Sequence, residues 1–379
     1  MIIDRDSPIP QYFQLQTWLM EQIEQGIFKP GDRIPTEEEL SQMAGLARAT
    51  VRQAIGNLVN MGLLNRKKRL GTFVQIQRTA TEKQTIIGIC IPDIRHGYAP
   101  ELARGAEDEA ASHKHSLILC NTDDSYLKAE YHANRLIEHS VSGVIFIPTA
   151  ASDERNRLIV EKFTKRGIPV VLADRTIPNL EIDHVTTDNF NGGYSITNYL
   201  IEKGHQRIAI VLGSLFSTER ERLAGYKAAL AEHGIPINPA IIIADAGPFI
   251  KERYREFAQS LLRQKRNFTA VFAGHDRIAL LFYAVARQLG LAIPDDISLV
   301  GYDDLPFITI SLTTMHQPIY EMGQESLRLI LSRIQGEITE PKHVVLKSHL
   351  VERSSVLALA KDISDNEPSI VTSMEKEQI

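Results

Sequence analysis

The first residues that could do chemistry in this sequence are two arginines spaced one helical turn apart, with a run of cations after them. Arg48 and Arg52 are separated by four positions. The cations that follow form one short run: Arg66, Lys67, Lys68 and Arg69. Guanidinium and ammonium groups neutralise phosphates, and Arg can also pair bidentately with the edge of guanine. The span 48–78 holds seven Lys or Arg and no acid. The run 66–69 alone is better explained as a solvated charged face, but a helix-turn-helix, an outward arginine pair, a basic hairpin and an acid-free span together favour DNA binding.

A second set of polar residues follows apolar runs later in the chain. It includes Asp174-Arg175, Arg222, His275-Asp276 and Asp303. Carboxylates accept hydrogen bonds and guanidinium groups donate them in a fork, which is the combination that holds the hydroxyl groups of a sugar. An Asp after a strand also caps the following helix, and any single one of these aspartates is better explained as a cap. The set as a whole predicts a site for a small polar ligand.

The arginine pair needs short helices to position it, and the sequence supplies their boundaries. Thr36 and Glu39, three residues later, form a capping box that predicts the start of a helix. Leu40, Met43 and Ala44 would form the buried face of that helix. Gly45 would end that helix in a left-handed turn. A second helix is predicted over 48–60, with Arg48 and Arg52 outward. Residues 63–64 and 71–74 read as a hairpin whose turn carries the four cations.

These motifs resemble the GntR-type winged helix-turn-helix. The resemblance rests on Gly31–Glu37, Ala49–Arg52, Gly62-Leu63 and Gly71–Val74, and it covers about residues 8–76. It implies that the recognition helix and wing contact DNA and that Glu37 supports them. Two positions depart from the family pattern, because Ala47 replaces the usual Ser or Thr cap and Arg69 replaces a wing glycine. The expected DNA-binding residues are Arg48, Thr50, Arg52, Gln53, Lys67, Lys68, Arg69 and Thr72.

After this region the pattern changes to apolar runs that alternate with amphipathic helices. Four runs lie at 86–91, 116–120, 143–147 and 169–173, and four more at 208–212, 241–244, 270–273 and 298–301. Strands covered on both faces look like this, so the segments read as βαβ units. The predicted fold class is α/β: a small winged helix-turn-helix domain followed by a two-lobed, doubly wound parallel-sheet domain. In such sheets the ligand lies beyond the carboxyl ends of the strands.

Eight ordered motifs in this second part resemble the LacI/GalR effector-binding core, which is similar to type I periplasmic sugar-binding proteins. Among them are Asp174-Arg175, Lys203–Ile208, Arg222–Tyr226, Ile293–Ser298 and Gly301–Asp304. The resemblance implies that Arg222 and Asp303 hold ligand hydroxyls and that His275 stands where the family commonly has Asn. The expected effector-binding residues are His96, Tyr98, Asp174, Arg175, Arg222, Phe249, His275, Asp276 and Asp303.

Length and composition set the domain organisation. A chain of 379 residues exceeds one core, and its 43% hydrophobic and 23% charged residues are those of an ordinary globular protein. We expect a DNA-binding domain at 1–76, a linker at 77–85, an effector and dimerisation domain at 86–357, and a disordered tail at 358–379. Residues 1–80 carry ten Lys/Arg and eight Asp/Glu, and the rest carries 32 and 39, so the cationic signal is local. No apolar run is long enough for a membrane span and no signal peptide opens the chain, which predicts a cytoplasmic protein with Cys90 and Cys120 reduced.

These features predict a ligand-responsive transcription regulator. Its partners would be double-stranded operator DNA, a small-molecule effector and a second copy of the chain in a homodimer. The first hypothesis is a repressor of a carbohydrate operon, released by a sugar such as L-arabinose. An alternative is a regulator with a purine-like or sugar-phosphate corepressor, and a weaker one is a sugar-metabolising enzyme. No phosphate-binding loop, zinc-protease motif or nucleophile elbow is present, so we expect no catalytic residue, metal or cofactor.

Overall fold

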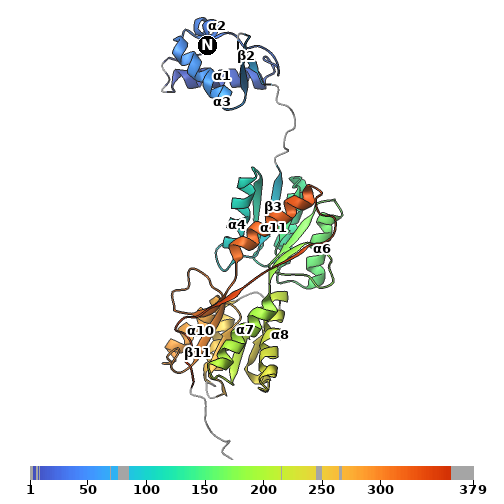
Figure 1. Cartoon of the computed structure of the whole chain (residues 1–379), viewed down its shortest axis with the longest axis vertical. Coiled ribbons are helices and arrows are strands. Elements are labelled where there is room, and N and C mark those ends of the chain that lie inside the picture. The colour runs from blue at the N-terminus through green and yellow to red at the C-terminus, as the bar shows by residue number, and fades with distance from the viewer. Residues whose placement is uncertain are drawn as a thin grey trace, which may run out of the picture. The chain divides into compact units, whose positions relative to one another are not determined.

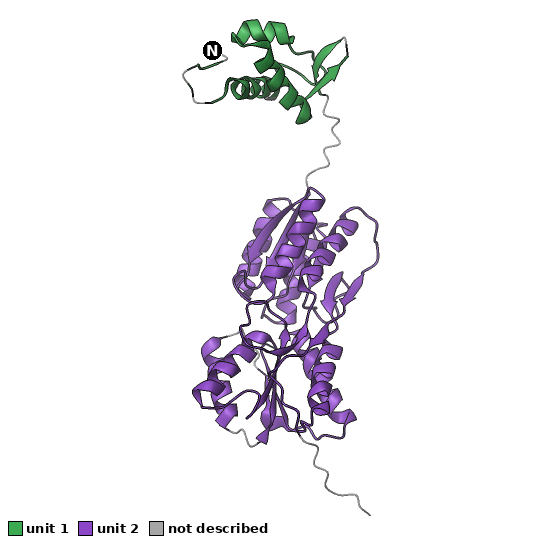
Figure 2. Cartoon of the chain, turned by 60° about the vertical axis from the view of Figure 1, so that its left-hand side comes forward, with its two compact units in different colours: residues 1–84 green, residues 85–379 purple. Residues whose placement is uncertain are grey.

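The computed structural model describes residues 3–5, 7, 9–68, 70–75, 85–214, 216–244, 250–263 and 267–359. The chain divides into two compact units, Met1–Gln84 and Thr85–Ile379, which Figure 2 distinguishes by colour. Four earlier predictions fall wholly or mostly outside the described residues: those for Arg69, Phe249, the linker 77–85 and the tail 358–379. Among the described residues, no helix is long and apolar enough to cross a membrane.

Unit 1 is a three-helix domain with a two-stranded hairpin. Its elements are α1 (Gln11–Glu24), α2 (Glu37–Ala44), α3 (Arg48–Asn60), β1 (Leu64–Lys67) and β2 (Gly71–Val74). The apolar faces of the three helices meet in one core, which includes Leu15, Leu19, Leu40, Val51, Ile55 and Leu58. This arrangement is the predicted winged helix-turn-helix, in which α3 is the exposed second helix of the motif.

The capping signals around α2 are confirmed. The Thr36 side chain accepts a hydrogen bond from the Glu39 backbone, and the Glu39 carboxylate accepts one from the Thr36 backbone. Gly45 ends the helix at a φ of 65°, which costs a residue without Cβ little. The prediction that Met43 is buried is wrong, because its side chain is 53% exposed. Leu40 and Ala44 alone cover the inner face of this short helix.

The hairpin differs from its prediction in where the first strand ends. β1 pairs with β2 from Leu64↔Val74 to Lys67↔Gly71, so Arg66 and Lys67 lie in a strand and not in the turn. Backbone pairing with Thr72 and Gly71 extends the strand by two residues through the cationic run. Arg66 and Lys67 are therefore carried by a strand of the wing.

Unit 2 contains two six-stranded sheets, each with helices on both faces. In spatial order the first sheet is β13 (His343–Leu346), β7 (His184–Thr187), β6 (Val170–Ala173), β5 (Gly143–Phe146), β3 (Ile86–Ile91) and β4 (Ser116–Asn121), all parallel. The second is β14 (His349–Val351), β12 (Thr313–His316), β11 (Ser298–Asp303), β10 (Ala270–Ala273), β8 (Ile208–Leu212) and β9 (Ile242–Ala244), in which β14 is antiparallel to β12 and the others are parallel. The central strands are fully buried, which explains their continuous apolar sequences.

Among the residues that the structure describes, eight α-helices cover the two sheets. On the first sheet, α4 (Ala99–Ser112) and α11 (Ile319–Ile334) pack on one face and α5 (Tyr126–Glu138) and α6 (Asp153–Thr164) on the other. On the second sheet, α7 (Asn189–Glu202) and α8 (Ser217–Glu232) pack on one face and α9 (Lys251–Arg263) and α10 (Asp276–Gln288) on the other. Each lobe is therefore a three-layer sandwich, as the alternating sequence pattern predicts.

The chain crosses between the lobes three times. It passes from β7 to α7, returns from β12 to α11, and crosses again from β13 to β14. Figure 1 shows the result, since α11, coloured for the C-terminal part of the chain, lies beside α4 from the start of the unit. Two crossings are joined directly, because Thr187 Oγ1 donates to Gln317 Oε1 over 2.6 Å. The carboxyl ends of strands from both sheets meet at these crossings.

Candidate functional site

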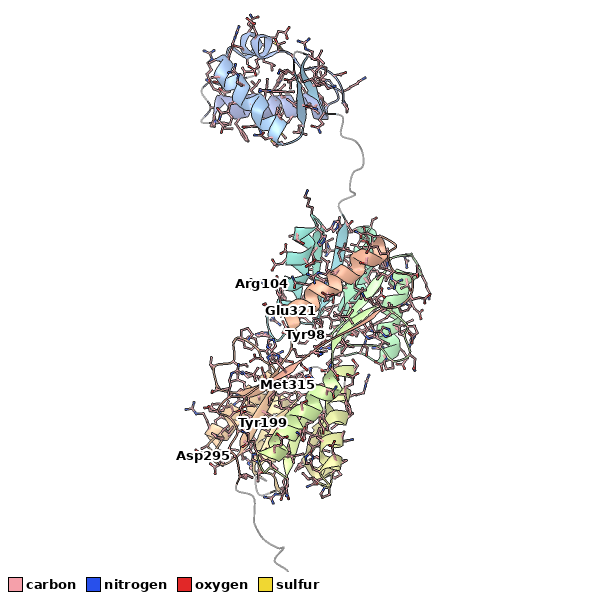
Figure 3. The ribbon with its side chains drawn as sticks, in the orientation of Figure 1. Tyr98, Arg104, Tyr199, Asp295, Met315 and Glu321 are labelled. Carbon is pink, nitrogen blue, oxygen red and sulfur yellow. The ribbon has the colours of Figure 1, made fainter. Side chains whose placement is uncertain are left out.

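A small cavity of about 100 Å³ lies between the two lobes of unit 2. Residues that follow β3, β4 and β6 line it from the first lobe. Residues of α8, residues that follow β8 and β10, and the last residue of β11 line it from the second. Tyr98, labelled in Figure 3, lies at the junction of the lobes. The cavity is therefore at the strand ends where the fold class predicts a ligand.

The first lobe contributes a connected set of charged and phenolic groups. Tyr98 donates its hydroxyl proton to Asp174 Oδ2 over 2.5 Å. Arg175 Nη1 donates to Asp124 Oδ1 over 2.6 Å and to the Pro148 carbonyl over 2.7 Å. The Arg175 guanidinium also stacks on the ring of Phe216, with 3.4 Å from Cζ to the ring centroid. These contacts hold the Arg175 fork at the cavity wall.

The second lobe holds Arg222 in the same way. Its Nε donates to Asn189 Oδ1 over 2.9 Å, and its Nη1 donates to the Gly274 carbonyl over 2.7 Å. Its guanidinium lies over the Tyr302 ring at 3.6 Å. Nη2 stays 3.9 Å from Asp303 Oδ1, a separation at which a ligand hydroxyl can bond to both groups.

Two of the aspartates on the cavity wall stand on unusual backbone. Asp174 has a φ of 62° and Asp303 a φ of 111°. Conformations of this kind cost residues other than glycine of the order of 1–3 kcal/mol and persist where the surroundings enforce them. For Asp303 the surroundings include Gln317 Nε2, which donates to Oδ1 over 2.6 Å. Strain at two strand ends that face one cavity is typical of a binding site.

Burial dominates the protonation behaviour of the cavity. It raises the pKa of Asp303 well above the usual value, and it raises the pKa of Asp174, although Arg222 and Arg175 respectively oppose the shift. Burial raises the pKa of Glu219 to about 7. Burial, together with the nearby Arg277, Arg222 and Arg175, lowers the pKa of His275 to about 3, so that ring is neutral.

Most of the predicted effector-binding residues lie on this one cavity. They are His96, Tyr98, Asp174, Arg175, Arg222, His275 and Asp303. Asp276 lies elsewhere, and its placement in the site needs correction. Its carboxylate accepts hydrogen bonds from Thr314 Oγ1 and from the Leu305 backbone, which ties α10 to the loop after β11. Phe249 is outside the described residues.

The sequence analysis missed further residues on the cavity. Glu219, Asp124 and Arg277 line it, and Gln317 positions Asp303 from outside it. Glu219 had a detectable signal, because it stands three residues before Arg222 and so on the same face of the helix. Asp124 had none, since its role depends on Arg175 reaching across from another strand.

In unit 1, the arginines of α3 are exposed but not free of acidic partners. Arg48 Nη2 pairs with Glu38, and Arg52 Nε lies 3.1 Å from Glu37. Glu37 also binds Arg66 Nη2 of the wing at 3.0 Å. The span 48–78 contains no acid, but carboxylates of α2 pair with its arginines. Exposed pairs of this kind contribute about 0–1 kcal/mol each, so phosphate can replace the carboxylate at little cost.

The remaining predicted DNA contacts lie on the same two elements. Gln53 is exposed and Thr50 half-buried on α3, while Lys67 and Lys68 are exposed on the wing. Lys67 Nζ lies 4.9 Å from the centroid of the Phe73 ring. Ala47 provides no side-chain cap to α3, as expected.

Comparison with known proteins gives the family. Residues 11–74 match the model of bacterial regulatory proteins of the gntR family, and residues 197–356 match a periplasmic binding protein-like domain. The arabinose metabolism transcriptional repressor of Geobacillus stearothermophilus is 30% identical over 363 residues, which cover 93% of this chain and 99% of that protein. The chain belongs to the GntR/LacI-type transcription regulators.

Solved structures agree with this assignment. The transcription regulator CcpA of Lactococcus lactis has a TM-score of 0.66 at 27% identity and covers 72% of this chain and 99% of its own. A LacI family transcriptional regulator from Enterococcus faecium, solved with bound ribose, has a TM-score of 0.63 at 32% identity and covers 73% and 100%. This GntR/LacI-type regulator thus pairs a GntR reader with a core like that of LacI-family proteins.

Proposed function

We propose that this regulator is a repressor that binds operator DNA through α3 and the wing and leaves it when a sugar fills the cavity of unit 2. The observation that carries the proposal is the cavity wall, where two buried guanidinium groups and two buried aspartates from opposite lobes face a space of about 100 Å³. Such a wall offers both hydrogen-bond donors and acceptors, and each of its buried guanidinium groups lies beside a buried aspartate.

The balance of charge favours a neutral, hydroxyl-rich effector. An anionic ligand would meet Asp174 and Asp303, and a cationic one would meet Arg175 and Arg222. A hydroxyl group donates to one partner and accepts from the other, so it satisfies both. The small volume favours a monosaccharide. L-Arabinose is the first candidate because one relative is named for arabinose metabolism, and ribose is the second because it is bound in a related structure.

On the DNA side, we propose that Arg48, Thr50, Arg52 and Gln53 enter the major groove. Lys67, Lys68 and Thr72 would contact the flanking backbone, and Glu37 would hold Arg52 and Arg66 in place until phosphate replaces it. Arginine at the start of an exposed recognition helix suits contact with guanine, and cations along a wing suit contact with phosphate.

The two sites would be coupled through a homodimer that reads two half-sites. A ligand that binds between the lobes shifts unit 2 towards the closed arrangement. The size of the shift equals the difference between the ligand's binding free energies for the closed and the open arrangement. If the closed arrangement holds the two readers at a spacing that does not fit the operator, the sugar weakens DNA binding by the same factor. Repression would then end when the sugar is present.

The first test measures effector binding to the full chain by isothermal titration calorimetry. The ligands are L-arabinose, D-ribose, D-xylose, cellobiose and guanine. Binding of one of the four sugars, lost in Arg222→Met and retained in a surface control such as Arg104→Met, supports the proposal. Binding of guanine alone, or of none of the five, contradicts it.

The second test selects DNA from a random duplex library with the full chain. Enrichment of a two-fold symmetric sequence supports a dimeric reader, because a dimer imposes its own symmetry on the operator. Enrichment of an unpaired half-site contradicts the dimer.

A further inference from the structure

Glu219 is a buried acid on the cavity wall that none of the contacts described so far employs. It stands in the first turn of α8, and its side chain is only 4% exposed. Oε1 accepts a hydrogen bond from the Gly213 backbone N–H over 3.0 Å. Oε2 is buried and has no hydrogen-bond partner among the described residues. A buried polar atom without a partner costs about 1–3 kcal/mol, so its position on a cavity wall calls for a ligand group.

The end of β8 is shaped around this carboxyl group. A methyl group at position 213 would come within 2.9 Å of Glu219 Oε1 and 3.3 Å of Oε2. The same methyl group would lie 3.4 Å from His275 Nε2, so glycine at 213 lets the carboxyl and the imidazole approach the backbone together. The Glu219 carboxyl group therefore packs against the backbone of Gly213, close to His275.

Burial favours the neutral form of Glu219, and the nearby charges offset this effect only in part. Arg222 of its own helix and Arg175 of the first lobe attract a negative charge, whereas Asp174 repels it, and the neutral His275 ring adds no charge. The two guanidinium groups already face two buried aspartates, Asp174 and Asp303. Desolvation opposes a further negative charge on this buried part of the wall.

We propose that Glu219 is an effector-binding residue that acts as a protonated acid, with the Oε2 hydroxyl donating a hydrogen bond to an oxygen atom of the bound sugar. The inference rests on the sugar-binding function proposed above and adds a residue and a protonation state to it. Binding buries the carboxyl group further and so keeps it protonated. When the sugar binds a chain whose Glu219 is ionised, Glu219 therefore takes up one proton from solution. The site accordingly binds its sugar more tightly below neutral pH than above it.

The size of the effect follows from the pKa of Glu219, which burial raises to about 7. If the bound state keeps the proton, affinity falls by about tenfold per pH unit once the free carboxyl is ionised. Between pH 7.5 and pH 9 the dissociation constant should rise about twentyfold. An ordinary histidine is already neutral throughout this window, so imidazole titration adds little.

The experiment measures the dissociation constant of the full chain by isothermal titration calorimetry at pH 7.5, 8.2 and 9.0. The probe is whichever of L-arabinose, D-ribose, D-xylose and cellobiose binds the wild-type chain most tightly. Three chains are compared: wild type, Glu219→Gln, and the matched control Glu232→Gln, which changes an exposed glutamate at the far end of the same helix. Titrations at pH 8.5 in phosphate and in Tris, which differ in ionisation enthalpy, count the protons taken up.

For the wild type and Glu232→Gln, we expect the dissociation constant to rise about twentyfold between pH 7.5 and pH 9. Both chains should take up close to one proton for each sugar bound. At pH 7.5 the sugar affinity of Glu219→Gln should lie within about threefold of the wild-type value, because the amide N–H also donates a hydrogen bond. Its affinity should not change with pH, and binding should take up no proton. A flat wild-type profile overturns the inference, and so does a Glu219→Gln chain that keeps the pH dependence. Loss of affinity by tenfold or more at pH 7.5 in Glu219→Gln also overturns it, since that result assigns binding to the carboxylate.

The design separates this inference from the proposed function. The wild-type titration is read first, and failure of all four sugars to bind overturns the proposed function and the role of Glu219 with it. When a sugar binds the wild type, the proposed function stands and the variants decide the role of Glu219 alone. Thermal unfolding of each variant confirms that the comparison is made between folded chains.

Discussion

His275 should make unit 2 sensitive to acid, and His275→Asn should remove that sensitivity. The ring caps α10, because its Nδ1 accepts a hydrogen bond from the Ile278 backbone N–H at 3.3 Å. A doubly protonated ring cannot accept this bond. Burial and the neighbouring Arg277, Arg222 and Arg175 also oppose a positive charge and lower the pKa to about 3.

The magnitude follows from the difference between the folded and unfolded states. A histidine in an unfolded chain has a pKa of about 6.5, so as pH falls below this value the unfolded chain binds a proton that the folded chain refuses. The folded pKa is the lower one, so the contribution of His275 to stability is intact above pH 6.5 and shrinks as pH falls towards 3. At pH 5 a shift of this size corresponds to about 2 kcal/mol. Since one side of the ring meets the cavity, solvent screens part of the repulsion, and we expect about 1–2 kcal/mol.

The assay is urea unfolding of the full chain at pH 8 and pH 5. The single tryptophan, Trp18, lies in unit 1, so its fluorescence reports that unit, while circular dichroism is dominated by the larger unit 2. Asparagine also caps helices and carries no charge. On going from pH 8 to pH 5, the free energy of unfolding should therefore fall by about 1–2 kcal/mol less in His275→Asn than in the wild type. The control His139→Asn, at an exposed position, should behave as the wild type. A His275→Asn chain that loses as much stability on acidification as the wild type would refute the reasoning.

Three further predictions concern the two sites and the reader's stability. Arg48→Ala should weaken binding to the selected duplex by about 1–3 kcal/mol in fluorescence anisotropy without changing the sugar titration, and unchanged DNA affinity would remove Arg48 from the interface. Asp303→Ala should do the reverse, weakening sugar binding by about tenfold to a hundredfold in calorimetry while DNA binding persists, and it loses its assigned role if sugar affinity is retained. Thr36→Ala removes the capping oxygen of α2 and should lower the stability of unit 1, followed by Trp18 fluorescence in urea, by about 1 kcal/mol, with no loss expected if the cap is unimportant.

Local signals predicted unit 1 well because its elements are short and begin and end with explicit residues. Thr36 and Glu39 form the capping box, and Gly45 takes the left-handed turn that a helix-turn-helix requires. Local signals failed where a neighbouring strand decides the outcome. Pairing with β2 extends β1 through Arg66 and Lys67, although those residues alone suggest a turn.

The cavity was predictable in outline because all parallel strands of a sheet end at one edge. Asp174 follows a buried strand of the first sheet and Asp303 ends a buried strand of the second, so each lies at the edge of its sheet where the fold class predicts a ligand. Topology does not say which way a side chain turns. Asp276 follows a strand too, but Thr314 Oγ1 and the Leu305 backbone draw its carboxylate away from the cavity.

Contacts between distant segments were beyond the sequence for the same reason. Glu37 and Glu38 reach the arginines of α3 only because α2 and α3 pack side by side. Glu219 reaches the cavity because the absence of a side chain at Gly213 leaves room for its carboxyl. Both depend on tertiary distances of a few ångströms, which spacing along the chain does not encode.

The central claim is that sugar binding in unit 2 and DNA binding by unit 1 oppose each other, and a coupled titration tests it most directly. Anisotropy of a fluorescent duplex taken from the selection gives the DNA affinity of the full chain with and without saturating sugar. Calorimetry gives the sugar affinity with and without the same duplex. The account predicts that each ligand weakens the other by one and the same factor, of about fivefold or more, because coupling between sites is reciprocal. Equal DNA affinity with and without a sugar that demonstrably binds would contradict it.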